Sequence, residues 1–290
     1  ILEIGPKWHM NKQNIPTMGG FMFIIGIAAA VIIGNIVMGE ISVSSLAVLG
    51  LAVAYGAVGL VDDYAKIKKK ENAGLTPKQK LVLQILVAAV FILVLFLKSD
   101  GLPSLMIPFT DISISLPWPV YIIFAAFVIV GADNAVNLTD GIDGLAASVT
   151  VPVAVFFAAV GVRIGNTGVT AFAGALAGGL LGFLIYNFNP AKVFMGDTGS
   201  LFLGGAVAGM AFACDMPLIL LLVGLIYIIE TLSVILQVTY FKATHGKRLF
   251  KMAPIHHHFE MCGWGEKRIV LTFTAVTIVL CLAAYFVALP

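Results

Sequence analysis

Nine apolar stretches of about 20 residues each run through this chain, and they restrict its fold more than any other feature. A helix needs about 20 mostly apolar residues to cross the hydrocarbon core of a bilayer. Only 11% of the residues are charged, against about 25% in a typical soluble domain. We therefore expect an all-α polytopic membrane protein, with one integral-membrane domain over residues 1–290 and nine transmembrane helices. The predicted spans are roughly 18–37, 43–61, 79–97, 118–136, 142–162, 168–186, 198–214, 217–240 and 269–289.

Lysine and arginine are distributed unevenly between the connections of these spans. If Ile1 starts inside, the outer connections hold only Lys98 and Arg163 of the 17 basic residues. Cytoplasmic loops carry such an excess of positive charge. The C-terminus is then expected outside, together with a small β-hairpin in which 105–109 pairs with the alternating residues 112–116.

Two further patterns concern the packing of single spans. Gly174, Gly178 and Gly182 recur every four residues, a spacing that lets a neighbouring helix approach closely. Glu230 lies near the middle of the predicted span 217–240. If that helix is bent or split, Glu230 is expected to face an internal cavity rather than lipid.

Six aspartates lie toward the basic, cytoplasmic side, and carboxylates at a membrane edge are candidates for function. They are Asp62 and Asp63 at the predicted end of the second span, Asp133 in the fourth, Asp140 and Asp143 at the start of the fifth, and Asp197 at the start of the seventh. Asp197 and Asp140 could instead cap their helices. Asp62 and Asp63 are placed at a helix C-terminus, where the macrodipole disfavours negative charge, so they suggest a cation or proton transfer.

The kinds of side chain on this side indicate the chemistry. Clustered carboxylates without cysteine or suitably spaced histidine suit Mg²⁺, which uses only one or two protein carboxylates and takes its other ligands from water and phosphates. His256, His257 and His258 follow Pro254 in an expected loop, and their rings would diverge, so they fit donors to phosphate or a proton-transfer element better than one metal site. A surface loop without function is the alternative. Carboxylates, cationic donors and an apolar surround together are typical of phosphoryl transfer.

Five motifs occur in order along the chain. They are Pro16-Thr17-Met18-Gly19-Gly20, Asp62-Asp63-Tyr64, the run 137–145 (Asn-Leu-Thr-Asp-Gly-Ile-Asp-Gly-Leu), the run 194–200 (Phe-Met-Gly-Asp-Thr-Gly-Ser) and the run 253–260 (Ala-Pro-Ile-His-His-His-Phe-Glu). With this topology, the whole chain resembles the bacterial phospho-N-acetylmuramoyl-pentapeptide transferases of the polyprenyl-phosphate N-acetylhexosamine-1-phosphate transferase superfamily.

The resemblance implies a reaction, a cofactor and a location. The family transfers phospho-N-acetylmuramoyl-pentapeptide from its uridine diphosphate carrier to undecaprenyl phosphate, giving lipid I and uridine monophosphate, and it requires Mg²⁺. It implies a homodimer in the bacterial inner membrane with the active site on the cytoplasmic face. The family has ten spans, so a first helix upstream of Ile1 is expected.

The resemblance also implies roles for individual residues. Asp197 would be the Mg²⁺ ligand, and Asp62, Asp63, Asp197 and His257 would be catalytic, with either Asp62 or Asp63 as base or nucleophile. The residues implied in substrate binding are Lys12, Thr17, Lys70, Lys78, Asn137, Asp140, Asp143, Asn187, Phe194, Gln237, His256 and His258.

Two alternative functions are compatible with parts of this pattern. A sister enzyme that transfers N-acetylglucosamine 1-phosphate to a polyprenyl phosphate would use the same aspartates, but the run 253–260 favours the muramoyl-pentapeptide branch. A cation-coupled transporter would place its site near the bilayer midplane, whereas these carboxylates gather toward one face. Membrane lipid and the two substrates are the expected partners, and no nucleic-acid polymer is expected.

Overall fold

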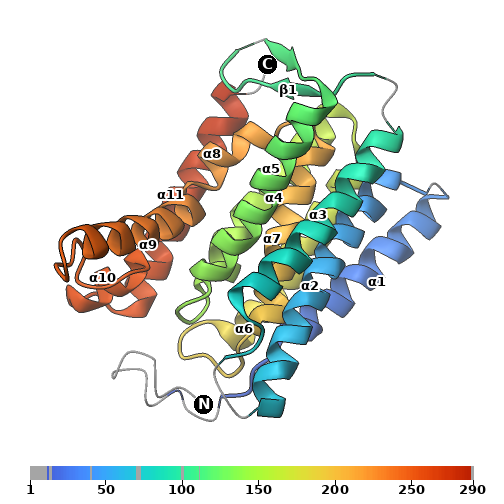
Figure 1. Ribbon diagram of the computed structural model, residues 1–290. Helices are drawn as coiled ribbons and strands as arrows, with labels where there is room; N and C mark the ends of the chain where they lie inside the picture. Colours follow the sequence, from blue (N-terminus) through green and yellow to red (C-terminus); the bar gives the residue numbers. More distant parts are fainter. Residues whose placement is uncertain are drawn as a thin grey trace.

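The computed structural model describes residues 12, 15–39, 41–69, 73–98, 101–110 and 112–288, and over these ranges the chain is almost entirely helical. The elements are α1 (Gly20–Met38), α2 (Val43–Lys69), α3 (Pro77–Lys98), β1 (Ser104–Met106), β2 (Ser113–Ser115), α4 (Trp118–Thr139), α5 (Leu145–Ile164), α6 (Thr167–Asn187), α7 (Gly196–Ala213), the 3₁₀ turn η2 (Pro217–Ile219), α8 (Leu220–Val223), α9 (Leu225–Ala243), α10 (Ile255–Met261), α11 (Glu266–Ala283) and the π-helical η3 (Ala284–Ala288). Figure 1 shows them as a bundle with the hairpin at one end.

The described residues contain eight helices that are long and apolar enough to cross a membrane, so the chain is an all-α polytopic membrane protein as predicted. The seventh predicted span, 198–214, forms α7 but is not among these eight. α7 has 18 residues and begins with Gly196 and Asp197, which lower its apolarity.

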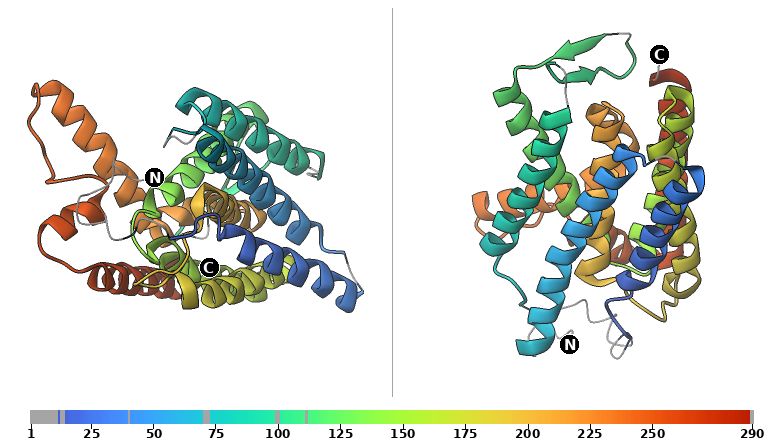
Figure 2. Two further views of the ribbon diagram at one scale, coloured as in Figure 1. Left: turned by 90° about the horizontal axis from the view of Figure 1, so that it is seen from below. Right: turned by 90° about the vertical axis from the view of Figure 1, so that its right-hand side faces the viewer.

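Helix α7 is the central helix of the bundle (Figures 1 and 2). All its residues from Thr198 to Phe212 are buried, and it packs chiefly against α2 and α4. Glycines allow this close approach. A Cβ on Gly205 would lie 2.8 Å from the Tyr55 ring, and a Cβ on Gly204 would lie 2.5 Å from the Cα of Asp133.

The predicted span 217–240 is split. The 3₁₀ turn η2 leads into α8, which stops at Gly224. Helix α9 begins after Gly224 and projects away from the bundle (Figure 2, left). The side chain of Glu230 is fully buried. In the split helix Glu230 therefore faces the protein interior rather than lipid, as expected.

The predicted outer hairpin is present, although its strands are shorter than expected. Strands β1 and β2 pair antiparallel in the register Ser104–Ser115, Leu105–Ile114 and Met106–Ser113. The hairpin and η3 lie at one end of the bundle, and the start of α1 lies at the other (Figures 1 and 2).

The glycine repeat in α6 does not have the predicted packing role. A Cβ on Gly174, Gly178 or Gly182 would meet no atom of the described chain within 4 Å, whereas one on Gly179 would lie 2.7 Å from Ile27 of α1. The four-residue spacing lies on a face that no described helix covers, and the adjacent position makes the close contact.

Helix α2 is longer than predicted and continues through Lys69. Asp62 and Asp63 therefore lie within the helix rather than at its C-terminus, and Lys66, Lys68 and Lys69 occupy its last turn. The predicted unfavourable macrodipole at Asp62 and Asp63 is wrong, because that effect is confined to the last turn of a helix. The pair owes its environment to neighbouring elements instead.

Candidate active site

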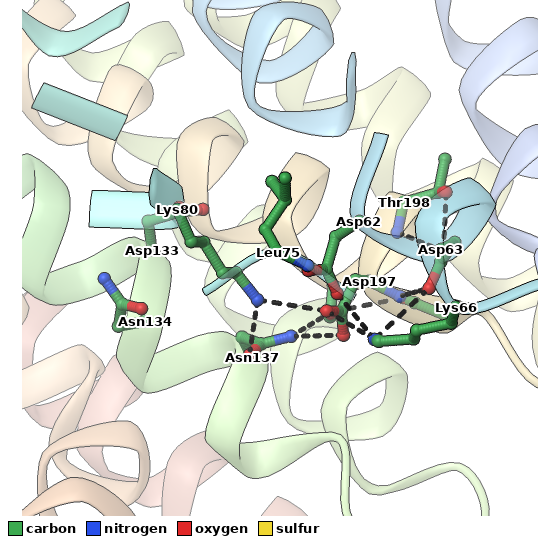
Figure 3. Close-up of polar contacts among 12 residues, drawn as sticks. Asp62, Asp63, Lys66, Leu75, Lys80, Asp133, Asn134, Asn137, Asp197 and Thr198 are labelled. Carbon is green, nitrogen blue, oxygen red and sulfur yellow. Dashed lines mark hydrogen bonds and ion pairs between the residues drawn. The ribbon is translucent and has the colours of Figure 1, made fainter. Parts of the chain in front are cut away.

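Three aspartates from two helices meet at one end of the bundle. Asp62 and Asp63 come from α2 and Asp197 from the first turn of α7, and each offers a carboxylate oxygen within 4.8 Å of the others. Asp62 and Asp63 are buried. Figure 3 shows these carboxylates converging with two lysines and Asn137. The convergence is possible because Gly59, one turn before Asp63, packs directly on the Asp197 backbone.

Asp63 holds the N-terminus of α7. Its Oδ2 accepts hydrogen bonds from the Thr198 amide (2.9 Å) and hydroxyl (2.7 Å), and its Oδ1 accepts one from the Asp197 amide (3.2 Å). No side chain of α7 itself caps the helix. The predicted alternative that Asp197 caps its own helix is therefore wrong, because a carboxylate from α2 occupies that position.

Lys66 bridges Asp62 and Asp197, and Lys80 also contacts Asp197. Lys66 Nζ lies 2.6 Å from Asp62 Oδ2, 2.9 Å from Asp197 Oδ2 and 3.6 Å from Asp63 Oδ1. Lys80 Nζ lies 3.0 Å from Asp197 Oδ2 and donates to Asn137 Oδ1 at 3.4 Å. The ammonium of Lys66 thus stands among all three carboxylates, where a cation is required to balance their charge.

Sequence reasoning selected other lysines. Lys78 is exposed, and Lys70 lies outside the described residues. Lys66 has a signal in the sequence, because it follows Asp62 by four residues and Asp63 by three, the spacings that place side chains on one helical face. Lys80 has none, since its partners are supplied by α4 and α7.

The donor set fits a hard divalent cation. The three carboxylates outnumber Lys66 and Lys80, so one negative charge remains uncompensated when all are ionised. Mg²⁺ binds oxygen at about 2.1 Å and typically keeps one or two protein carboxylates. Asp197 and Asp62 are suited to such binding if Lys66 moves aside, whereas Asp63 has its oxygens engaged at α7.

Asn137 links the acidic cluster to α4. Its Nδ2 donates to Asp197 Oδ1 (3.1 Å) and to Ser200 Oγ (2.7 Å). One turn deeper, Asp133 is fully buried and accepts a hydrogen bond from Gln84 at 2.7 Å. Asn137 therefore belongs to the site, whereas Asp133 lies beneath it.

Asp140 and Asp143 lie in the turn before α5 rather than on a common helical face, and Gly144 precedes that helix. Neither aspartate caps α5, because no side-chain cap is present there. Burial raises the pKa of the Asp140 carboxyl well above its usual range, and the charges of Asp197, Asp63 and Asp143 raise it further.

A second charged group surrounds Asp143. Lys12 Nζ lies 2.6 Å from Asp143 Oδ1 and 2.7 Å from Glu266 Oε1. Asp143 Oδ2 also accepts from the side chain of Asn189 (3.0 Å) and the amide of Ala191 (2.9 Å). Lys12 and Asp143 were predicted from the sequence, but Glu266, which begins α11 outside any recognised motif, was missed.

The three histidines lie in helix α10 rather than in the expected loop, and they have separate partners. His256 Nδ1 lies 2.9 Å from Glu230 Oε2, and His257 Nδ1 lies 2.6 Å from Glu260 Oε2. His258 Nδ1 accepts the Lys251 amide at 3.1 Å. The predicted divergence of the rings is wrong for His256 and His257, whose ring centroids lie 4.2 Å apart, although each of the three rings has its own hydrogen-bond partner.

The remaining predicted residues are divided between two places. Thr17 and Phe194 lie beside the N-terminus of α7, since the Phe194 amide donates to Pro16 O and its carbonyl accepts from Gly19, both at 2.8 Å. Asn187 is buried and donates to Val193 O at 2.9 Å. Gln237, in contrast, accepts the amides of Leu249 and Phe250 and so shapes the loop after α9.

The sequence of this chain is similar to those of known proteins. The profile described as glycosyl transferase family 4 matches residues 45–215, which include the three aspartates. The chain is thus an integral-membrane phosphoglycosyl transferase.

Curated relatives narrow this class. The phospho-N-acetylmuramoyl-pentapeptide-transferase of Clostridium perfringens is 50% identical over 98% of this chain and 88% of its own length. The enzyme of the same name from Clostridium acetobutylicum is 48% identical over 98% of this chain and 88% of its own length. The one from Listeria monocytogenes is 46% identical over 96% of this chain and 86% of its own length. The chain belongs to the phospho-N-acetylmuramoyl-pentapeptide-transferase family.

Proposed function

We propose that this chain transfers phospho-N-acetylmuramoyl-pentapeptide from its uridine diphosphate carrier to undecaprenyl phosphate, releasing uridine monophosphate and forming lipid I in peptidoglycan synthesis. The observation that carries the proposal is the cluster of Asp62, Asp63 and Asp197 with Lys66 and Lys80 at one end of a membrane bundle. The names of relatives at 45–50% identity supply the substrates.

Mg²⁺ is the proposed cofactor, with Asp197 as its principal ligand and Asp62 as the second candidate. Bound there, it would neutralise charge on the diphosphate and the leaving group. Asp63 contributes differently, because it fixes the α7 backbone that carries Asp197.

The lysines and Asp62 have roles that follow from their contacts. Lys66 and Lys80 compensate Asp197 in the free protein and become available to phosphate oxygens when a divalent cation takes over that role. Asp62, held by the Leu75 amide at 2.7 Å, is proposed either to take the proton from the lipid phosphate, which then attacks the sugar-linked phosphorus and displaces uridine monophosphate, or to attack that phosphorus itself and pass the phosphosugar to the lipid phosphate in a second step.

The surrounding groups are proposed to bind the sugar nucleotide. Asn137, Asp140 and the Asp143–Lys12 pair lie on the site side of α4 and its following turn. Asn187, Phe194, Thr17 and the histidines complete the predicted binding set. Gln237, Lys78 and Lys70 remain proposals from the resemblance, as do the catalytic role of His257 and the homodimer.

The proposed orientation places the acidic cluster on the cytoplasmic face of a bacterial inner membrane and the C-terminus outside. The positive-inside count supports it, because all but two of the basic residues fall on the side of the site. A midplane transporter is disfavoured by the same arrangement.

The experiment is an assay of the purified protein in nanodiscs with undecaprenyl phosphate, the uridine-linked substrate and Mg²⁺. Uridine monophosphate should be released, and chelation of the metal should abolish release reversibly. Asp197→Asn and Asp62→Asn should each lower turnover about 10²-fold or more, because a positioned charge is lost in the transition state. Full activity in both variants would contradict the assignment, and release with N-acetylglucosamine donors alone would favour the sister activity.

A further inference from the structure

A carboxylate and an imidazole form a buried pair away from the three aspartates. Glu230 of α9 and His256 of α10 are both fully buried, with Oε2 and Nδ1 2.9 Å apart. Acidic residues within spanning helices are costly to bury and generally serve a function. Among the described residues, the contacts of the three aspartates involve neither Glu230 nor His256.

Each member of the pair keeps one atom without a hydrogen bond. Glu230 Oε1 and His256 Nε2 are buried and have no partner among the described residues. When a carboxylate accepts the Nδ1 proton of a histidine, it fixes the tautomer and leaves Nε2 as the free nitrogen. Glu230 is therefore placed to decide which edge of the ring is available.

The free edge of His256 faces a turn that carries candidate substrate residues. A Cβ on Gly141 would collide with His256 Nε2, so the ring packs against the backbone of Gly141. Gly141 lies between Asp140 and Asp143, and Asp143 contacts Lys12 at 2.6 Å and Asn189 at 3.0 Å. The imidazole thus lies between α9 and the turn 140–144, beside the proposed binding site.

We propose that Glu230 is a positioning residue for the transfer reaction, which holds the Nδ1 proton of His256 and turns Nε2 toward the Asp140–Gly141 turn. Because Nε2 is itself buried against Gly141, the pair fixes the position of the turn that carries Asp140 and Asp143, which are proposed to bind the sugar nucleotide. The inference rests on the proposed function. Glu230 itself touches no substrate and acts through His256.

The kinetic test is a double-mutant cycle on the full chain in nanodiscs. Glu230→Ala should lower kcat about 10- to 100-fold, the usual range when a group that orients a functional histidine is lost. Glu230→Gln keeps a carbonyl that can accept the Nδ1 proton, so it should lose less. The variant E230A/H256A should be no slower than H256A alone.

The matched control is Thr231→Val, the next residue of α9. Its hydroxyl donates only to the Tyr227 carbonyl of the same helix at 3.0 Å, so Thr231→Val should keep the wild-type kcat. Multiplicative losses in E230A/H256A would overturn the proposal, because they would mean that Glu230 acts on folding rather than through His256.

A spectroscopic test needs no substrate and separates this inference from the proposed function. In ¹⁵N-histidine-labelled protein, the signal lost in His256→Gln identifies that ring. The wild type should show a proton on Nδ1, and Glu230→Ala should shift the population toward the Nε2 proton. An unchanged spectrum in Glu230→Ala would overturn the pairing even if lipid I is formed. The predicted spectra without lipid I formation would retain the pairing and reject the function.

Discussion

At the scale of residues, the two adjacent aspartates of α2 do different work. Asp63 saturates its oxygens with three donors at the start of α7, whereas Asp62 faces Lys66 and the Leu75 amide. A charged acceptor at a helix N-terminus stabilises it through hydrogen bonds and the macrodipole. Two side chains of the same chemical type therefore have different roles: Asp63 positions α7, whereas Asp62 is the one proposed to react.

Asp63→Asn should destabilise the protein more than Asp62→Asn. Asparagine lacks the second acceptor oxygen and the charge, so the start of α7 loses about 1–2 kcal/mol. Thermal unfolding in detergent should show a lower Tm for Asp63→Asn, with Asp62→Asn as its matched neighbour. Equal Tm values for the two variants would contradict the capping role.

Lys80→Gln should lower turnover more than Lys78→Gln, although the two lysines lie in the same helical turn. Lys80 contacts Asp197 and Asn137, whereas Lys78 is exposed. Loss of one positioned donor in such a site costs about 10²-fold. Release of uridine monophosphate measures it, and a larger loss in Lys78→Gln would restore the lysine that the resemblance favoured.

At the scale of elements, α7 decides where the site is. It runs through the centre of the bundle and places Asp197 where α2, α3 and α4 supply their side chains. The glycines of α7 permit this, since a Cβ on Gly205 would lie 2.8 Å from Tyr55 and 3.1 Å from Ala52. Small residues at helix interfaces allow such close backbone approach in membranes.

Gly205→Ala should lower stability, whereas Gly178→Ala should not. The added methyl group at Gly205 meets α2, and overpacking of this kind costs about 1–3 kcal/mol. At Gly178 it meets no described atom within 4 Å, and alanine is the better helix former. Tm measurements on the pair check this, and a similar fall in both would show that α6 is covered by something outside the chain.

At the scale of the whole molecule, the bundle has two unlike ends. The hairpin and η3 lie together, and the end of α2 and the start of α7, which carry the three aspartates, lie toward the other end (Figure 1). Asymmetric basic charge orients membrane proteins. The two ends should therefore face opposite sides of the membrane.

Cysteine labelling should reveal that orientation. Cys262, at the end of α10, is exposed, whereas Cys214 and Cys281 are buried. A membrane-impermeant maleimide should label Cys262 in inside-out vesicles only. In a Cys262→Ser background, Thr110→Cys in the hairpin should be labelled in right-side-out vesicles only, and the reverse pattern would overturn the assigned topology.

The sequence by itself determined the all-α membrane class, most of the spans and the set of aspartates. Hydropathy is a property of consecutive residues, so a window of about 20 of them is sufficient for a span. The Lys66 contact was also within reach, because its partners lie on the same helix.

Only the tertiary structure decided which groups act together. Lys66 and Asp197 are separated by 131 positions in the sequence, and Lys80 and Asp197 by 117. Glu230 and His256 are 26 positions apart and belong to two different helices, α9 and α10. A stretch of apolar residues does not by itself distinguish a buried central helix such as α7 from a lipid-facing one, because lipid and protein interior are both apolar. The packing of the helices brings Lys80 rather than Lys78 to Asp197, and the close contact of Gly59 with the Asp197 backbone brings Asp63 to the start of α7.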